Sequence, residues 1–193
     1  MAPVPFYDIS IGCYTKALRV LLRILKVASE HPDVASFLDS RLAPDMFPLL
    51  LQVRIATRHP VRLVEALTGK QLVPWNEART NWGQLEKSWP ELIARVKETL
   101  EILAQVGPEE AESKADDTKL PMQVGPEENG ADAFLQVPAA EFTMATGIPE
   151  TLFHVYITYA ILRSKGVDLG KKDILIPFLP DYVLNDLPGA QVV

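Results

Sequence analysis

The sequence predicts an all-α protein: an antiparallel four-helix bundle with a small β element between its third and fourth helices and an extended C-terminal tail. Four segments, near residues 10–29, 44–68, 80–105 and 149–165, carry apolar residues at helical spacing. One long connection separates the last two of these segments, a topology that helix bundles tolerate. A chain of 193 residues, 48% of them apolar, can build one sizeable core, so we expect a single domain over residues 1–193.

Caps and prolines mark the first two helices. Ser10 suits the start of the first helix, which should end before Pro32 because the residue preceding a proline is pushed out of helical geometry. The second helix is expected to begin near Pro44 and to end at Gly69. Pro60 lies inside its apolar pattern and should kink or split it, because proline lacks the N–H group that the helix needs.

The third and fourth helices have similar signals. Thr80 or Asn81 can open the third helix, and Pro90 marks either a kink or a fresh start within it. The fourth helix should cover residues 149–165, because a strongly apolar run there is followed by Gly166.

The remaining segments lack a helical period. Residues 105–132 are rich in Glu, Asp, Gly, Pro and Lys, which predicts a flexible, exposed acidic loop. Residues 133–137 and 141–144 are short apolar runs that could pair as a small hairpin. The tail, residues 174–193, is apolar but irregular, so we expect it to pack extended across the bundle or against a second subunit of a homodimer.

Composition narrows the classes of function. The net charge is -6 and the basic residues are scattered, which argues against a nucleic-acid partner. Cys13 is the only cysteine, so an internal disulfide and a cysteine-based zinc site are excluded. We see neither a signal peptide nor an apolar run long enough for a membrane span, and we expect a cytoplasmic protein without membrane partners.

His154 is the most informative single residue, because it alone of three histidines lies inside a strongly apolar segment. An imidazole titrates near neutral pH, so a buried one is a candidate for proton transfer. The alternative is a core histidine that simply hydrogen-bonds a neighbour.

Two long motifs make the chain resemble a known family. One is Arg41-Leu-Ala-Pro-Asp-Met-Phe-Pro-Leu49 followed by Gln52-Val53, and the other joins Phe153-His154 to Tyr159-Ala-Ile-Leu-Arg163 and Gly166-Val-Asp-Leu-Gly-Lys171. Both are similar to the DUF1993 family, which is grouped with the DinB-like (YfiT-like) four-helix bundles. The resemblance covers residues 7–175, and the long acidic loop and tail resemble elaborated members from filamentous fungi.

The resemblance implies a fold more firmly than a reaction. DinB-like relatives often hold a divalent metal on three histidines. This chain has only His31, His59 and His154, and the first two lie beside prolines. Asp45 could complete a mixed ligand set, but the sequence shows no three-histidine arrangement, so we expect neither a metal nor another cofactor.

Fungal members of this kind are associated with polyketide pathways, which implies a cofactor-free cyclase that closes a lactone, an α-pyrone, on a polyene or polyketide chain. The substrate would be a small molecule, free or bound to a carrier protein. On this reading the catalytic residues are His154 as base, Asp45 as its orienting carboxylate and Tyr159 as a hydrogen-bond donor. The substrate-binding residues are Gln52 and Arg54 as polar donors, with apolar walls from Phe47, Phe153 and Trp82.

Each of these residues also has a structural interpretation. Asp45 would suit a first helical turn, Arg54 could extend to the surface, and Trp82 could belong to the core. Three classes of function therefore stay open: the cofactor-free cyclase, a metal-dependent DinB-like transferase or hydrolase, and a non-catalytic binding or assembly protein.

Overall fold

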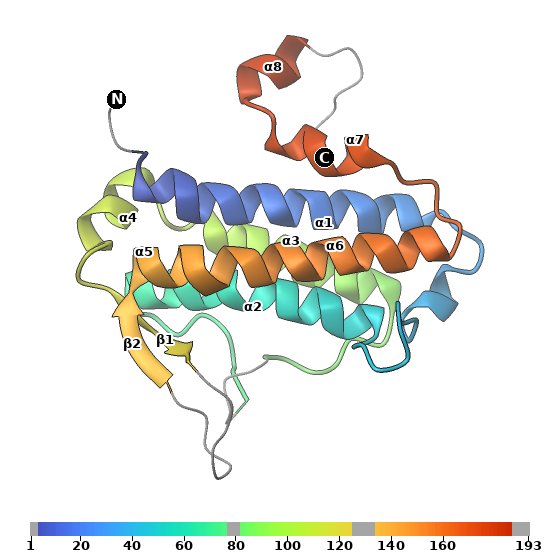
Figure 1. Cartoon of the computed structure of the whole chain (residues 1–193), viewed down its shortest axis with the longest axis horizontal. Helices are drawn as coiled ribbons and strands as arrows, with labels where there is room; N and C mark the ends of the chain where they lie inside the picture. The colour runs from blue at the N-terminus through green and yellow to red at the C-terminus, as the bar shows by residue number, and fades with distance from the viewer. Residues whose placement is uncertain (1–3, 77–81, 125–133, 187–193) are drawn as a thin grey trace.

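Four long helices packed lengthwise form the body of the molecule (Figure 1). They are α1 (Cys13–Ser29), α2 (Leu49–Thr68), α3 (Trp89–Leu103) and α6 (Ile148–Ser164) in a computed structural model that describes residues 4–76, 82–124 and 134–186. Their facing sides supply most of one continuous hydrophobic core. The predicted all-α bundle is confirmed. Among the described residues, no helix combines the length and the apolar character that crossing a membrane requires.

Helices α2 and α3 point the same way (Figure 1). Helix α6 lies antiparallel to α2 and parallel to α1 (Figure 1). The indole N–H of Trp89, at the start of α3, donates to the Leu25 carbonyl oxygen near the end of α1 at 2.9 Å. This bond joins the antiparallel helices α1 and α3.

Prolines set the starts of α2 and α3, and both helices begin later in the chain than predicted. Helix α2 begins at Leu49 and not near residue 44, because Phe47 precedes Pro48, whose own backbone is extended. Pro60 does not split α2, which continues to Thr68. Helix α3 begins at Trp89 with Pro90 in its first turn, so Pro90 marks a fresh start. The expected opening at residues 80–81 lies outside the described residues, but residues 82–88 are described and are not helical, so the predicted third helix begins too early.

The long connection between α3 and α6 is more ordered than predicted. It contains α4 (Pro108–Lys114) and β1 (Lys119–Gln123), and β1 pairs antiparallel with β2 (Phe134–Pro138), opposing Lys119 to Pro138. The small β element is therefore present, but its expected second strand at 141–144 is wrong. That segment is helical, as α5 (Ala139–Phe142) and a π-helical turn, η3 (Thr143–Gly147), which lead directly into α6.

A second π-helical turn, η1 (Asp8–Gly12), precedes α1 and lies against η3. Here Gly147 faces the fully buried Tyr14: a Cβ at position 147 would overlap the Tyr14 hydroxyl oxygen. Only glycine therefore permits this close approach between the start of α1 and the start of α6.

The tail is not extended as expected. It forms α7 (Lys171–Leu175), a 3-10 turn at Ile176–Phe178 and α8 (Asp181–Asp186). Helix α7 and the 3-10 turn lie against the outer side of α1, and α8 stands farther from it (Figure 1). Arg23 of α1 pairs with Asp173 of α7 at 2.8 Å. The rest of the predicted tail, residues 187–193, lies outside the described residues.

Candidate functional site

A cluster of ionisable side chains lies between α2 and α6. Glu150, in the first turn of α6, is joined to two neighbouring residues of α2: His59 Nε2 lies 2.5 Å from Glu150 Oε2, and Arg58 pairs with Glu150 Oε1. His154 is one helical turn beyond Glu150, and its Nε2 is 3.9 Å from Glu150 Oε1. We call His59, Glu150 and His154, with Arg58, the His–Glu–His cluster.

The tautomer of His154 follows from its partner Gln52. The Gln52 amide nitrogen donates to the Phe47 carbonyl oxygen at 2.9 Å, which fixes the orientation of the amide. Gln52 Oε1 therefore faces His154 Nδ1, at 2.6 Å, and must accept a hydrogen bond from it. A neutral His154 then carries its proton on Nδ1, and its Nε2, 3.9 Å from Glu150 Oε1, keeps a free lone pair.

Burial decides the protonation of the cluster. Burial lowers the pKa of His154 to about 4, although the charge of Glu150 acts in the opposite direction. Burial also lowers the pKa of His59. For Glu150, burial opposes ionisation, but the hydrogen bond and electrostatic attraction of His59, followed by the charge of Arg58, outweigh it and lower the pKa to about 2. Near neutral pH the cluster therefore holds an ionised carboxylate and two neutral imidazoles.

His59 has the opposite tautomer to His154. Its Nε2 must donate to the ionised Glu150, so its Nδ1 carries no proton. That Nδ1 is buried and has no hydrogen-bond partner among the described residues, while the ring packs edge-on against Phe142 at 5.3 Å. The cluster thus contains two imidazole nitrogens that can accept a proton.

Four of the predicted site residues gather at one place. Gln52 and His154 are hydrogen-bonded to each other, and Phe47 supplies the carbonyl that orients Gln52. The Phe153 ring lies edge-on to the His154 ring at 5.2 Å. His154 is only 7% exposed, whereas Phe47 and Phe153 are 54% and 52% exposed. The exposed Phe153 ring therefore lies beside a buried imidazole, and Phe47 contributes its backbone carbonyl to the residue that holds that imidazole.

Asp45 and Tyr159 are placed differently. Because α2 begins at Leu49, Asp45 lies in the exposed turn before the helix and does not share a helical face with Gln52. The structure gives Asp45 no hydrogen bond or ion pair with any residue that it describes. Tyr159 is half-buried against the core, and its hydroxyl has no hydrogen bond among the described residues.

Arg54 and Trp82 belong to a separate buried cluster. Arg54 donates to the Trp82 carbonyl oxygen at 3.1 Å and pairs with Glu86, which also pairs with Arg95 at 2.9 Å. The Arg95 guanidinium stacks 3.6 Å from the centre of the Trp82 ring. These contacts fasten the segment before α3 onto α2, and they leave Arg54 and Trp82 outside the His–Glu–His cluster.

Sequence reasoning missed Glu150, His59 and Arg58. A signal for Glu150 was present, because it precedes His154 by four residues on a predicted helix and the two side chains must share a face. No comparable local signal joins His59 to them, since it lies 91 residues away in the chain.

The residues do not fit the three-histidine metal site of DinB-like relatives. His31 lies in the turn after α1, where its Nδ1 accepts from the Asp33 backbone and its ring packs on Phe37. Arg58 occupies Glu150 Oε1 with a positive charge, which disfavours a cation there. Within the described ranges, no three His, Cys, Asp or Glu side chains are arranged to hold a metal ion.

Three cavities lined by described residues lie away from His154. One is between α2 and β1, one lies beside the segment before α3, and one is at the junction of α1 and α3. The cluster reaches the surface beside the exposed Phe153, at Arg58 and Glu150, whose side chains are 21% and 29% exposed.

Comparisons with known proteins agree with this architecture. A family model described as "Domain of unknown function (DUF1993)" matches residues 6–175. A crystal structure of a DinB family member protein from Shewanella denitrificans is similar, with a TM-score of 0.65 and 28% sequence identity over 88% of this chain and 90% of that one. No curated protein matches the sequence. The chain belongs to the DUF1993 family, within the DinB-like superfamily.

Proposed function

We propose that this protein is a cofactor-free acid–base enzyme that closes a lactone ring, an α-pyrone, on a polyketide-type acyl chain. The observation that supports this proposal is the fixed tautomer of His154. Gln52 holds the imidazole proton on Nδ1, and Glu150 lies beside the free Nε2. A neutral, oriented imidazole with an ionised carboxylate next to it is the arrangement that general-base catalysis needs.

The reaction assigns a task to each group. His154 Nε2 removes the proton of an enol hydroxyl, and the enol oxygen attacks the acyl carbon of the same chain. A carbon–oxygen bond forms, and the bond from the acyl carbon to its thiol or hydroxyl leaving group breaks. The proton passes from His154 to that leaving group. Glu150 stabilises the imidazolium between these two steps, as carboxylates do for catalytic histidines.

Arg58 is the proposed donor to the developing oxyanion. Its guanidinium already lies beside Glu150, and its Nε is buried without a hydrogen-bond partner among the described residues. A preorganised charged donor at this place stabilises negative charge on the carbonyl oxygen. The proposal thus gives Gln52 the orienting role that the sequence suggested for Asp45, and it leaves Glu150 to stabilise the imidazolium. It keeps Tyr159 only as a candidate donor.

Phe47 and Phe153 provide the apolar surface for the chain of the substrate. Both are about half exposed and both adjoin the residues that hold His154. The substrate can be free or attached to a carrier protein, since this surface is open. We also retain a cytoplasmic homodimer as part of the proposal, to be tested by light scattering of the purified protein.

The test uses a 3,5-dioxoacyl thioester, which contains the enol and the acyl carbon that the reaction needs. Formation of the pyrone is followed by its ultraviolet absorbance against the spontaneous rate. We expect His154→Ala to lower kcat by roughly 100-fold or more, Gln52→Leu to lower it less, and His31→Ala, outside the cluster, to leave it unchanged. Circular dichroism of each variant controls for folding.

Three results would contradict the proposal. A folded His154→Ala variant that forms pyrone at the parent rate would remove His154 from the mechanism. Activity that is abolished by a chelator and restored by one divalent metal would instead favour the metal-dependent transferase or hydrolase. If no pyrone forms above the spontaneous rate, a binding or assembly role replaces catalysis.

A further inference from the structure

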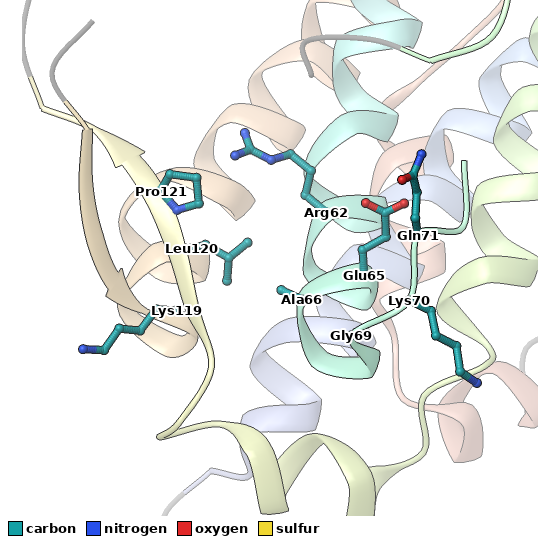
Figure 2. A pocket seen from close by; sticks show the side chains of 9 residues that line it. All are labelled: Arg62, Glu65, Ala66, Gly69, Lys70, Gln71, Lys119, Leu120 and Pro121. Carbon is teal, nitrogen blue, oxygen red and sulfur yellow. The ribbon is translucent and has the colours of Figure 1, made fainter. Parts of the chain in front are cut away.

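A cavity of about 450 Å³ lies between the second half of α2 and strand β1, apart from the His–Glu–His cluster (Figure 2). Its wall on α2 includes Arg62 and Ala66, and its wall on β1 includes Leu120 and Pro121. Cavities of this size are typical of sites for small organic ligands.

The charge around this cavity is positive, in a protein whose net charge is -6. Arg62, Lys70 and Lys119 line it, against one carboxylate, Glu65. The Lys70 and Lys119 ammonium groups make no hydrogen bond or ion pair with the described residues, and Figure 2 shows them at the rim with their stems directed outward. Their long, flexible stems can bring either charge to a ligand at the rim.

The carboxylate of Glu65 offsets only part of this positive charge, because both of its oxygens accept hydrogen bonds from the loop after α2. Glu65 Oε1 accepts from the backbone N–H groups of Leu72 and Val73, and Oε2 accepts from the indole N–H of Trp75 at 2.6 Å. These bonds fix the loop after α2. The left-handed Gly69, with φ of 68°, makes the turn that brings Lys70 to the rim.

The rest of the cavity is apolar. Ala66 and Leu120 face each other across the space between α2 and β1, and Pro121 lies beside Leu120 (Figure 2). The Arg62 side chain extends from α2 toward Pro121, so its guanidinium lies at the border between the polar and apolar parts (Figure 2).

We propose that this cavity binds a small amphipathic carboxylate, with the carboxylate on the Arg62 guanidinium and the hydrocarbon part against Ala66, Leu120 and Pro121. Arginine is suited to this role because its planar donors match both oxygens of a carboxylate. Lys70 and Lys119 add attraction at the rim. This proposal does not rest on the lactone-closing activity.

Occupation of this site would also affect the His–Glu–His cluster. Arg62 lies three residues after His59 on α2, and its charge is one of the causes, after burial, that lower the pKa of His59. A bound carboxylate would offset this charge, so the pKa of His59 should rise when the site is filled.

The probe for the test is hexanoate, titrated into the full-length ¹⁵N-labelled protein and followed by NMR. We expect saturable shifts at the Ala66 and Leu120 amides and at the Arg62 side-chain N–H. Hexylammonium, which has the same hydrocarbon part and the opposite charge, should not produce them. Shifts that are scattered over the surface, or equal for both probes, would overturn the proposal.

Substitutions locate the charge that matters. Arg62→Gln should weaken hexanoate binding about tenfold or more, and Lys70→Gln with Lys119→Gln should weaken it a few-fold. Lys165→Gln, an exposed lysine after α6, is the matched control and should bind like the parent. If Arg62→Gln does not fold, the test uses the double lysine variant instead. An affinity of that variant for hexanoate equal to the parent's would overturn the proposal. The readout uses neither His154 nor pyrone formation, so its failure is separate from failure of the proposed activity.

Discussion

The contact between Gly147 and Tyr14 yields a prediction that one substitution should be harmful and a second should reverse it. A Cβ at residue 147 would overlap the Tyr14 hydroxyl oxygen, but it would lie 3.3 Å from Tyr14 Cζ and 3.4 Å from Phe142 Cε1. Tyr14 is fully buried, so its ring has little room to move away. Gly147→Ala should therefore destabilise the protein, and Tyr14→Phe should relieve the collision.

The magnitude follows from two opposing effects. Overpacking a core costs about 1–3 kcal/mol, and a direct overlap belongs at the upper end of that range. Alanine is better than glycine in a helix by about 1 kcal/mol, and the backbone before Ile148 is helical. Gly147→Ala alone should thus lower the free energy of unfolding by about 2 kcal/mol. In the Tyr14→Phe background, the same change should lie within about 1 kcal/mol of zero.

The assay is a double-mutant cycle measured by urea unfolding, with circular dichroism as the signal. Tyr14→Phe alone should have a small effect, because the hydroxyl has no hydrogen-bond partner among the described residues. Gly107→Ala is the matched control, since a Cβ there meets nothing within 4 Å. If Gly147→Ala is as stable as the parent, or if Tyr14→Phe fails to rescue it, the close packing of α1 against η3 is wrong.

Two further predictions concern buried charge. His154 stays neutral when folded, with a pKa of about 4 against 6.5 when unfolded, so the unfolded chain binds more protons and stability falls between pH 6.5 and 4. His154→Gln should reduce this loss of unfolding free energy by roughly 1–3 kcal/mol, and His31→Gln should leave it unchanged. Equal losses in the parent and both variants, measured by urea unfolding, would refute this. Glu86→Gln should cost about 3 kcal/mol or more, because it leaves two buried arginines without their shared partner. The exposed Glu98→Gln should change the midpoint of thermal unfolding little, and a similar small change for Glu86→Gln would contradict the prediction.

Local periodicity made the fold predictable from the sequence. The apolar stripe of α6 and the glycine after it placed that helix within one residue at each end, because spacing and helix-stop signals are local. The start of α2 was misjudged although its cause is also local, since Pro48 displaces the preceding residue from the helix. The partner of β2 was missed for a different reason. Strand pairing joins residues that are distant in sequence, and β1 lay in a segment whose composition indicated a loop.

In the candidate site, too, local features were predictable from the sequence and contacts between distant residues were not. The sequence alone determined that His154 lies in an apolar helix and that Gln52 lies on another, because both facts follow from residues close to each of them. Only the tertiary structure decided that these two meet across 102 residues, that His59 joins them through Glu150, and that Asp45 does not. The packing of α2 against α6 determines which of these side chains meet, because local sequence patterns do not distinguish them. The same packing buries both imidazoles and so keeps them neutral.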